Sequence, residues 1–335
     1  MNNYSNTISE LLKPDITEKA VVLDLFAGCG GLSLGFEAAG YKTYGYEMVP
    51  EAAATYNRNM EGHCFAHKLT VGFDYSEIES PDIIIGGPPC QPFSRFGNQE
   101  GFKDARDGFP IFIDAVKRFH PIIFLFENVA NIIGRHRWYF DLIVNELKKE
   151  NYHISYRLLN AKDYGVPQNR ERLVCVGHRG GFSFPEAEKK QVTVEEAIGD
   201  TMLDERPTDK ILTPRMDEYI AAYEQKSHCI TPRDLHPGQP ARTITCRNLA
   251  GATSDMQRVK LPDGRRRRIT VREAARLQSF PDWFEFEGNE TRQYYQIGNA
   301  VPPLLAYKLA LAVKEAYKAA CEGTAVYYPE TLFDI

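Results

Sequence analysis

The sequence lacks the features that mark membrane proteins, disulfide-rich secreted proteins and zinc proteins. No window approaches the ~18 consecutive apolar residues of a membrane span, and the first residues show no secretory signal. The seven cysteines are odd in number, scattered, and include no Cys-x-x-Cys pair, so neither a disulfide framework nor a zinc site is indicated. We therefore expect a cytoplasmic protein without a metal ion, in which any one cysteine is available as a nucleophile.

An overall excess of positive charge is also missing, because the formal net charge is −5. Taken alone, this balance argues mildly against binding to nucleic acid. The charge is uneven, however, and residues 258–276 predict a local basic face. The basic residues of this stretch are Arg258, Lys260, Arg265, Arg266, Arg267, Arg268, Arg272 and Arg276.

Apolar runs alternate with helical patterns along the first part of the 335-residue chain. This alternation predicts an α/β fold with a doubly wound, Rossmann-like sheet. The expected strands are 21–26, 44–47, 81–87, 122–126, 155–159 and 172–177. The expected helices are 32–39, one after Pro50, 111–119, 139–150 and 304–320. Residues 1–19 are polar and irregular, and the pattern changes near Gly180, where a proline- and charge-rich stretch without a long helix predicts a second domain.

Residues 24–31 (DLFAGCGG) form the end of the first expected strand and the loop after it. The glycines allow the backbone to turn sharply and to approach a ligand closely, and Glu47, about 20 residues further on, is placed to accept ribose hydroxyls. The spacing differs from Gly-x-Gly-x-x-Gly, so an adenosyl ligand without phosphates fits at least as well as a dinucleotide. A tight turn without any ligand remains an alternative.

Cys90 follows the third expected strand, in the segment 86–94 (GGPPCQPFS). Pro88, Pro89 and Pro92 fix the backbone without forming a helix, and a stiff loop at the edge of the sheet can position an attacking thiolate. A buried structural cysteine is the alternative, which this proline-rich setting disfavours.

Two further segments carry charged groups to the same edge. Residues 127–129 (ENV) follow the fourth expected strand, and a glutamate paired with a thiol implies acid–base support for a covalent step. Residues 168–172 (QNRER) carry arginines at alternate positions, which are suited to a base carbonyl and a phosphate. A helix cap and a solvated strand edge are the respective alternatives.

Taken together, these segments resemble the motifs of the bacterial cytosine-C5 DNA methyltransferases, in the family's order and over nearly the full chain. Residues 24–31 resemble the first motif, 86–94 the Pro-Cys motif, 127–129 the Glu-Asn-Val motif, and 168–172 the Gln-x-Arg-x-Arg motif. Two later segments resemble the ninth and tenth motifs: 268–278 (RITVREAARLQ) with 280–282, and 296–303 (QIGNAVPP).

The resemblance implies a catalytic role for four residues. Cys90 is expected to add to C6 of a cytosine that has been flipped out of double-stranded DNA. Glu127 is expected to hold N3 and the exocyclic amine, Arg172 the carbonyl oxygen, and Arg170 a backbone phosphate. Residues 91–108 are expected to be a closing loop.

The resemblance also implies S-adenosyl-L-methionine as methyl donor, S-adenosyl-L-homocysteine as product, and no metal. The residues implied at this site are Phe26, Gly28, Gly30, Gly31, Leu32, Glu47, Met48, Gly87, Pro89, Asn299 and Ala300. The chain departs from the family twice: residues 67–70 (HKLT) replace a motif whose aspartate reads the adenine amine, with Asp74 nearby but offset, and Met48 replaces an aromatic residue.

Because the tenth motif must return to the first, we expect a discontinuous catalytic domain of residues 1–180 and 289–335. Residues 181–288 are expected to form a smaller, mostly β target-recognition domain with a recognition loop at 241–256. In that loop Arg247, Asn248 and Asp255 have suitable chemistry for base edges. The other expected DNA contacts are Gln91, Ser94 and Arg95 after the nucleophile, and Arg265 and Arg266 at phosphates.

The expected enzyme is a monomer that methylates a short palindrome, in protection against a cognate restriction enzyme. The recognition loop resembles those of enzymes that modify degenerate GC-rich six-base sites. Alternatives are a tRNA cytosine-C5 methyltransferase, a non-catalytic DNA-binding relative and a dinucleotide oxidoreductase. The long recognition region and the basic stretch before the ninth motif favour DNA over tRNA. The presence of both Cys90 and Glu127 argues against a non-catalytic relative, and the glycine spacing argues against an oxidoreductase.

Overall fold

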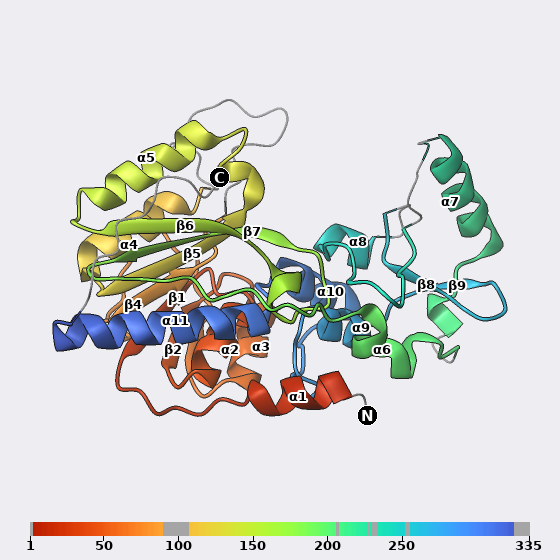
Figure 1. Ribbon diagram of the computed structural model, residues 1–335, viewed down its shortest axis with the longest axis horizontal. Helices are drawn as coiled ribbons and strands as arrows, with labels where there is room; N and C mark the ends of the chain where they lie inside the picture. Colours follow the sequence, from red (N-terminus) through yellow and green to blue (C-terminus); the bar gives the residue numbers. More distant parts are fainter. Residues whose placement is uncertain are drawn as a thin grey trace.

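The computed structural model describes residues 3–89, 107–205, 208–226, 228, 233–251 and 255–324. Its main feature is a seven-stranded sheet in the order β3-β2-β1-β4-β5-β7-β6, in which β7 runs antiparallel to both of its neighbours (Figure 1). The strands are β1 (Val21–Leu25), β2 (Lys42–Tyr46), β3 (His63–Phe65), β4 (Ile83–Gly86), β5 (Ile123–Val129), β6 (His153–Asn160) and β7 (Glu171–His178). The predicted doubly wound sheet is confirmed.

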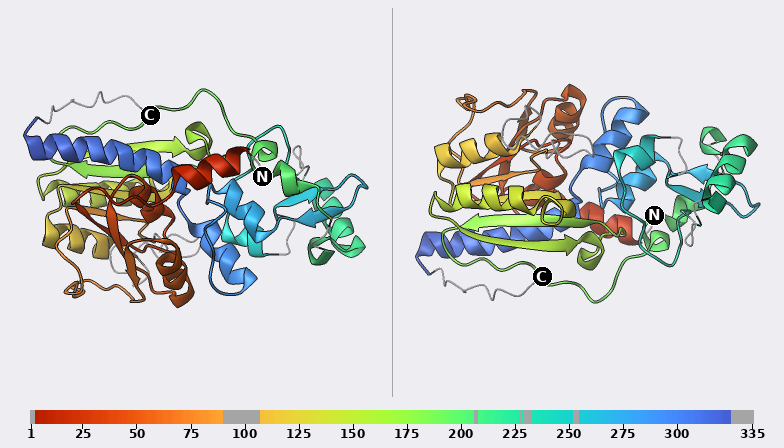
Figure 2. Two further views of the ribbon diagram at one scale, coloured as in Figure 1. Left: turned by 90° about the horizontal axis from the view of Figure 1, so that it is seen from below. Right: turned by 90° about the horizontal axis from the view of Figure 1, so that it is seen from above.

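Helices cover both faces of this sheet (Figures 1 and 2). Alternate strand residues face opposite sides, so Val22 packs in one core with α2 and α11, while Leu23 packs in another with α4 and α5. The helices around the sheet are α2 (Gly31–Ala38), α3 (Pro50–Asn59), α4 (Phe109–Phe119), α5 (Arg137–Lys148) and α11 (Pro303–Glu322). Burial on both faces explains why the central strands read as continuous apolar runs.

The C-terminal helix α11 returns to the first part of the chain and lies against α2. At Gly35 the two backbones are so close that a Cβ atom would lie 2.3 Å from the Tyr307 amide nitrogen. The end of the chain therefore joins the domain that its beginning forms, as expected from the sequence.

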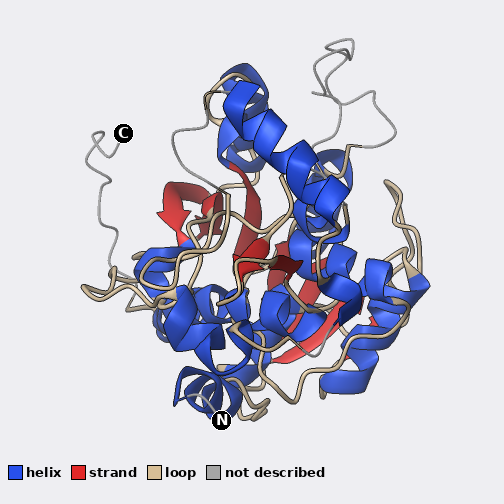
Figure 3. Cartoon of the chain, turned by 90° about the vertical axis from the view of Figure 1, so that its right-hand side faces the viewer, coloured by secondary structure: helices blue, strands red, loops and turns tan. Residues whose placement is uncertain are grey.

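Residues 181–288 are not mostly β, and this prediction is wrong for the part that the structure describes. They contain α6 (Val194–Met202), α7 (Pro214–Lys226), α8 (Cys246–Ala250) and α9 (Val271–Leu277), with only a two-stranded sheet of β8 (Arg258–Lys260) and β9 (Arg266–Arg268). Figure 3 faces the side of the molecule that carries α7, where helices and loops dominate. The sequence analysis missed helix α7, although Met216, Tyr219, Ile220 and Tyr223 recur there at helical spacing; Ile220 is its one fully buried residue.

The sequence analysis also did not predict α6, α8 and α9, the short strand β3, or the helices α1 (Asn3–Leu11) and α10 (Glu290–Asn299). Short 3₁₀ turns complete the described elements: η2 (Ala130–Ile132), η3 (Ala161–Tyr164) and η4 (Thr208–Lys210). Among the described residues, no helix is both long and apolar enough to span a membrane.

The second half of the chain shares a hydrophobic core with the first. Ile198, Ala274 and Ile297 pack in one cluster with Leu34 and Tyr56, so α6, α9 and α10 rest on α2 and α3. A small separate cluster contains Leu212, Ile220 and Met256. The boundaries of a recognition domain stay a prediction, since the larger cluster crosses both of them.

Candidate active site

A cavity of about 770 Å³ lies at the carboxyl ends of the parallel strands β1, β2, β4 and β5. Strands that run parallel end at one edge of a sheet, which is where α/β proteins bind ligands. The expected site residues that line this cavity are Phe26, Gly28, Gly31, Leu32, Glu47, Met48, Gly87, Pro89, Glu127, Arg170, Arg172, Asn299 and Ala300. Segments far apart in the sequence thus meet around one space.

Gly30 is the exception among the expected ligand-binding residues. It precedes α2 in a left-handed conformation (φ +89°), and a Cβ atom there would lie 2.4 Å from Met60 Cε. Gly30 therefore faces the core rather than the cavity, and the first turn of α2 needs a glycine there for steric reasons.

Glu47, directly after β2, fixes the glycine loop after β1. Its carboxylate accepts hydrogen bonds from the Gly28 amide (3.0 Å) and the Val49 amide (2.8 Å), one on each oxygen. Each oxygen keeps a second lone pair, and a Cβ atom at Gly28 would have nothing within 4 Å. The donor set and the open space fit a ribose and its attached groups.

Asp24, a buried residue of β1 just before this loop, is a carboxyl group with a perturbed pKa. Burial raises its pKa to about 7, and the hydrogen bond from Ser33 (2.7 Å) opposes this effect only in part. The Glu47 carboxylate raises the pKa further. The folded protein therefore holds a proton at Asp24 that the unfolded chain releases near its ordinary pKa.

We expect Asp24→Asn to make the stability of the protein less dependent on pH. Because the folded-state pKa is raised, the wild type loses stability as pH rises from about 4 to about 7, the latter being the raised value. Denaturant unfolding at pH 5 and pH 8 should show a smaller loss for Asp24→Asn, and the same loss as wild type for the exposed control Glu79→Gln. Identical losses in Asp24→Asn and wild type would contradict this assignment.

Glu127 and Arg172 form an ion pair at the wall of the cavity. Arg172 Nε lies 2.9 Å from Glu127 Oε1, and each side chain is 13% exposed. The antiparallel register of β5 and β7 places Arg172 opposite Val129, so Glu127, two residues away, points to the same face. Glu127 Oε2 would also lie 3.8 Å from a Cβ atom on Gly87, which brings the Glu-Asn-Val and Pro-Cys motifs together.

Four expected site residues, Cys90, Gln91, Ser94 and Arg95, lie outside the described residues. The described chain leads towards them from β4 through Pro88 and Pro89, which line the cavity. The Asn128 side chain, buried in β5, donates a hydrogen bond to the Pro88 carbonyl oxygen (3.0 Å). Sequence reasoning gave Asn128 no separate role, although it is part of the motif.

Arg170 does not fit the phosphate contact expected from the sequence. It is 3% exposed, and its terminal nitrogens donate to the carbonyl oxygens of Ile244 (2.7 Å) and Ala300 (3.1 Å). Burial, together with the charge of Arg172, lowers its pKa to about 9. Arg170 thus ties the segment after residue 241 to the end of α10, because residue 170 points into the junction rather than along an exposed edge.

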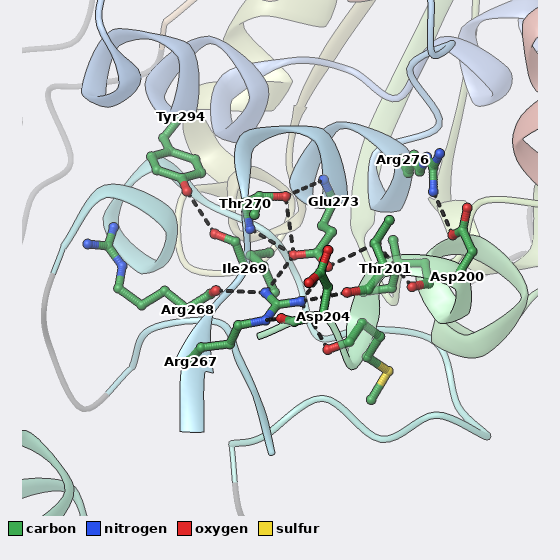
Figure 4. A network of polar contacts seen from close by, with 12 residues as sticks. Asp200, Thr201, Asp204, Arg267, Arg268, Ile269, Thr270, Glu273, Arg276 and Tyr294 are labelled. Atoms are coloured by element: carbon green, nitrogen blue, oxygen red, sulfur yellow. Dashed lines mark hydrogen bonds and ion pairs between the residues drawn. The ribbon is translucent and has the colours of Figure 1, made fainter. Parts of the chain in front are cut away.

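The arginine-rich stretch 258–276 does not form the expected basic face. Arg258 and Arg267 are 0% exposed, and Arg258 pairs with Glu224 and Asp234. Arg267 pairs with Glu273 and donates to four carbonyl oxygens, those of Thr201, Met202, Asp204 and Arg268 (Figure 4). Arg267 thus holds α6, β9 and α9 together, and Arg258 connects β8 to α7 and Asp234.

The two expected phosphate contacts are also engaged within the protein. Arg266 pairs with Asp217 (2.7 Å), and Arg265 pairs with Asp263 and Glu205. Their positive charges are compensated, so the phosphate role predicted for them is not supported. Composition alone reveals the cations of the stretch but not the carboxylates that meet them.

We expect Arg267→Ala to lower the free energy of unfolding by about 3–5 kcal/mol, because it leaves the buried Glu273 carboxylate without its partner. Denaturant unfolding measures this difference. Arg137→Ala is the control, since the pair of Arg137 with Asp141 is half exposed and such pairs contribute about 0.2–1 kcal/mol. Equal losses of unfolding free energy in the two variants would show that the buried pair stabilises the protein no more than an exposed pair does.

The residues expected to read bases are placed differently from one another. Asn248 is buried and caps α8, accepting from the Thr245 amide and donating to the Thr243 carbonyl, so it does not present its amide to a base. Asp255 accepts from Arg233 and Arg242, which corrects the expectation that it reads a cytosine amine. Arg247 is exposed on α8.

His67, Lys68 and Leu69, from the segment that departs from the family motif, also line the cavity. Asp74 is exposed and binds Ser76 instead, so it does not replace the missing adenine-reading carboxylate. Sequence reasoning missed Asp107, Thr245 and Tyr295, which also line the cavity. No group of three His, Cys, Asp or Glu side chains suited to a metal occurs among the described residues.

Comparison with known proteins identifies a family to which the chain is similar over most of its length. The chain matches the C-5 cytosine-specific DNA methylase family over residues 20–315. It is 56% identical over 305 residues to the type II methyltransferase M.AplI of Arthrospira platensis, covering 90% of this chain and 88% of that protein. It is 33% identical over 360 residues to M.BspRI of Lysinibacillus sphaericus, covering 89% and 82%.

Among solved structures, the chain resembles a proposed DNA modification methyltransferase encoded within a prophage (E. coli). The TM-score is 0.68 at 24% identity, covering 90% of this chain and 100% of the other. The S. pombe Dnmt2 methyltransferase gives a TM-score of 0.68 at 16% identity, covering 88% and 98%. These likenesses concern the fold alone.

Proposed function

The chain belongs to the C-5 cytosine-specific DNA methylase family, and from this premise we propose how its residues methylate DNA. It is a DNA cytosine methyltransferase of the restriction–modification type. The observation that carries the proposal is the convergence of the first, Pro-Cys, Glu-Asn-Val, Gln-x-Arg-x-Arg and tenth motifs on one cavity.

The cavity residues fit S-adenosyl-L-methionine by their chemistry. Glu47 has lone pairs for the ribose hydroxyls, Gly28 leaves open space, and Met48 offers an exposed apolar surface for the adenine. Asn299 and Ala300 complete the site from the end of α10. When bound, the donor supplies an electrophilic methyl group and leaves as S-adenosyl-L-homocysteine.

Cys90 acts as the nucleophile in this proposal. Its thiolate forms a bond to C6 of a cytosine flipped out of the duplex, and the electrons of the C5–C6 double bond make C5 nucleophilic. C5 then takes the methyl group. Loss of the C5 proton to a base and cleavage of the S–C6 bond restore the double bond and release 5-methylcytosine and the thiolate.

Glu127 and Arg172 hold the cytosine by its polar edge. Along that edge the exocyclic amine is a hydrogen-bond donor, whereas N3 and the carbonyl oxygen are acceptors. The Glu127 carboxyl group accepts from the amine with one oxygen and shares a proton with N3 through the other. Arg172 donates to the carbonyl oxygen. Their ion pair (2.9 Å) keeps the two groups adjacent before the base arrives, which reduces the reorganisation needed during the reaction.

A methyl-transfer assay with duplex DNA and tRNA as alternative substrates tests this proposal. We expect methylation of the duplex, and bisulfite sequencing of DNA from a host that expresses the protein should show 5-methylcytosine within one short sequence. Methylation of tRNA with none of duplex DNA would contradict it. We further propose that the enzyme acts as a monomer and protects host DNA from a cognate restriction enzyme.

Asn128 is a positioning residue in this scheme, because it holds the loop that leads to Cys90. Asn128→Ala removes the hydrogen bond to the Pro88 carbonyl, and a small misplacement of a reacting group lowers rates by up to about 10²-fold. We expect kcat to fall about tenfold. The affinity for the methyl donor, measured by calorimetry, should be unchanged. An unchanged kcat, or an equal loss of donor affinity, would contradict this role.

A further inference from the structure

Two arginines share one carboxylate in the region between α7 and β8. Arg233 and Arg242 both donate through Nη1 to Asp255 Oδ1, and Arg242 Nη2 also donates to the Asp255 carbonyl oxygen at 3.2 Å. The three side chains are 28%, 39% and 32% exposed. This Arg233–Asp255–Arg242 cluster is thus held in place yet open to solvent.

The cluster differs from the other arginine pairs of the region in its charge. Arg258, Arg265 and Arg276 each meet two carboxylates, and Arg267 meets one in a buried setting. In the Arg233–Asp255–Arg242 cluster two guanidinium groups meet one carboxylate, that of Asp255, among the residues that the structure describes, so positive charge is in excess there. An anionic nucleic acid is attracted to such a site.

The cluster is connected to the cavity through a short segment. The Thr243 hydroxyl donates to the Asn169 carbonyl (2.7 Å), next to Arg170, and Thr245 lines the cavity itself. Arg242 is three residues from Thr245 along this segment. Arg242 thus belongs to the segment that leads to the cavity.

The chemistry of Arg242 leaves donors for a ligand. A guanidinium carries two hydrogens on each terminal nitrogen, and the bonds to Asp255 use one on each. A carboxylate that fixes the guanidinium also reduces the conformational freedom lost on binding. In the major groove guanine presents O6 and N7 as acceptors, and arginine is their commonest partner.

We propose that Arg242, oriented by Asp255, reads a guanine of the target sequence, and that Arg233 supplies supporting positive charge. This inference rests on the proposed function, since it concerns the DNA site of that activity. It reverses the expectation that Asp255 itself reads a base. Asp255 is instead a positioning residue for the arginine that does.

The test uses duplexes in which each guanine of the methylated sequence is replaced in turn by 7-deazaguanine, which lacks the N7 acceptor. With the wild type, kcat/KM should fall about tenfold at one guanine position. With Arg242→Gln, kcat/KM on the unmodified duplex should already be low, and 7-deazaguanine at that position should cause no further loss. Asp255→Asn should lose discrimination at the same position, whereas Asp263→Asn, an exposed aspartate paired with Arg265, should behave as wild type.

The outcomes separate this inference from the proposed function. If the wild type methylates no unmodified duplex, the proposed function fails. If the wild type is active but insensitive to 7-deazaguanine at every position, the inference fails. It also fails if Arg242→Gln weakens all duplexes equally, as loss of a phosphate contact would. Because the first arm uses the wild type, the inference can be overturned even if a variant does not fold.

Discussion

Replacing Cys90 by serine is expected to abolish methyl transfer, with a loss of at least about 10⁴-fold in kcat, because the covalent route through C6 is lost. A serine hydroxyl is a far weaker nucleophile at neutral pH than a cysteine thiolate. Sequence-specific binding to duplex DNA should persist, since it depends on other residues. The measurements are transfer of labelled methyl groups and a DNA-binding titration.

Cys321→Ser is the matched control, because Cys321 is an exposed cysteine on α11. It should retain full activity. Full turnover by Cys90→Ser would remove Cys90 from the mechanism, and loss of DNA binding together with turnover would point to misfolding rather than to chemistry.

Glu127→Gln should have the second largest effect, a fall of about 10²–10⁴-fold in kcat, the range expected when an acid–base or charge-stabilising group is lost. Glutamine keeps the size of the side chain but removes the charge beside Arg172. The affinity for DNA should change little, because the target base is only a small part of the contact. Single-turnover kinetics at saturating DNA measure the effect.

Glu146→Gln provides the comparison for this substitution. Glu146 also meets cations, Lys117 and Lys149, but lies on α5, away from the cavity lining. It should leave kcat unchanged. A kcat of Glu127→Gln within about twofold of wild type, far less than the loss expected for such a group, would contradict the role of Glu127 in activating the base.

The sheet was predictable because its central strands are buried on both faces. Residues 83–86 and 123–126 face helices on either side, so nearly every position must be apolar and the run stands out. The cavity followed from the same logic, since Glu47, Gly87 and Glu127 each come at the carboxyl end of a parallel strand. Local pattern and overall topology agree in this half of the chain.

The second half was harder to predict because its polar side chains bond within the protein, several of them to partners that are distant in sequence. Arg258 looks like a surface cation, yet it is buried against Glu224 and Asp234. Asn248 looks like a base reader, yet it caps α8. The spacing of apolar residues along the sequence does not predict such pairs, because an ion pair or a helix cap needs only two residues that lie close together in space.

The ninth motif illustrates the same limit. Thr270 and Glu273 form a capping box that begins α9, a signal visible in sequence. The second task of Glu273, to pair with buried Arg267, is not visible. Glu273 of the motif thus also helps to hold α6, β9 and α9 together, through its ion pair with Arg267.

The most direct test of the central claim, covalent addition of Cys90 to cytosine, is a trapping experiment. A duplex with 5-fluorocytosine at the methylated position is incubated with the enzyme and S-adenosyl-L-methionine, and the product is analysed by denaturing electrophoresis and mass spectrometry. The fluorine cannot leave as a proton does, so the account predicts a stable protein–DNA complex linked through Cys90. An enzyme that methylates ordinary cytosine but forms no such complex, or forms it through another residue, would contradict the account.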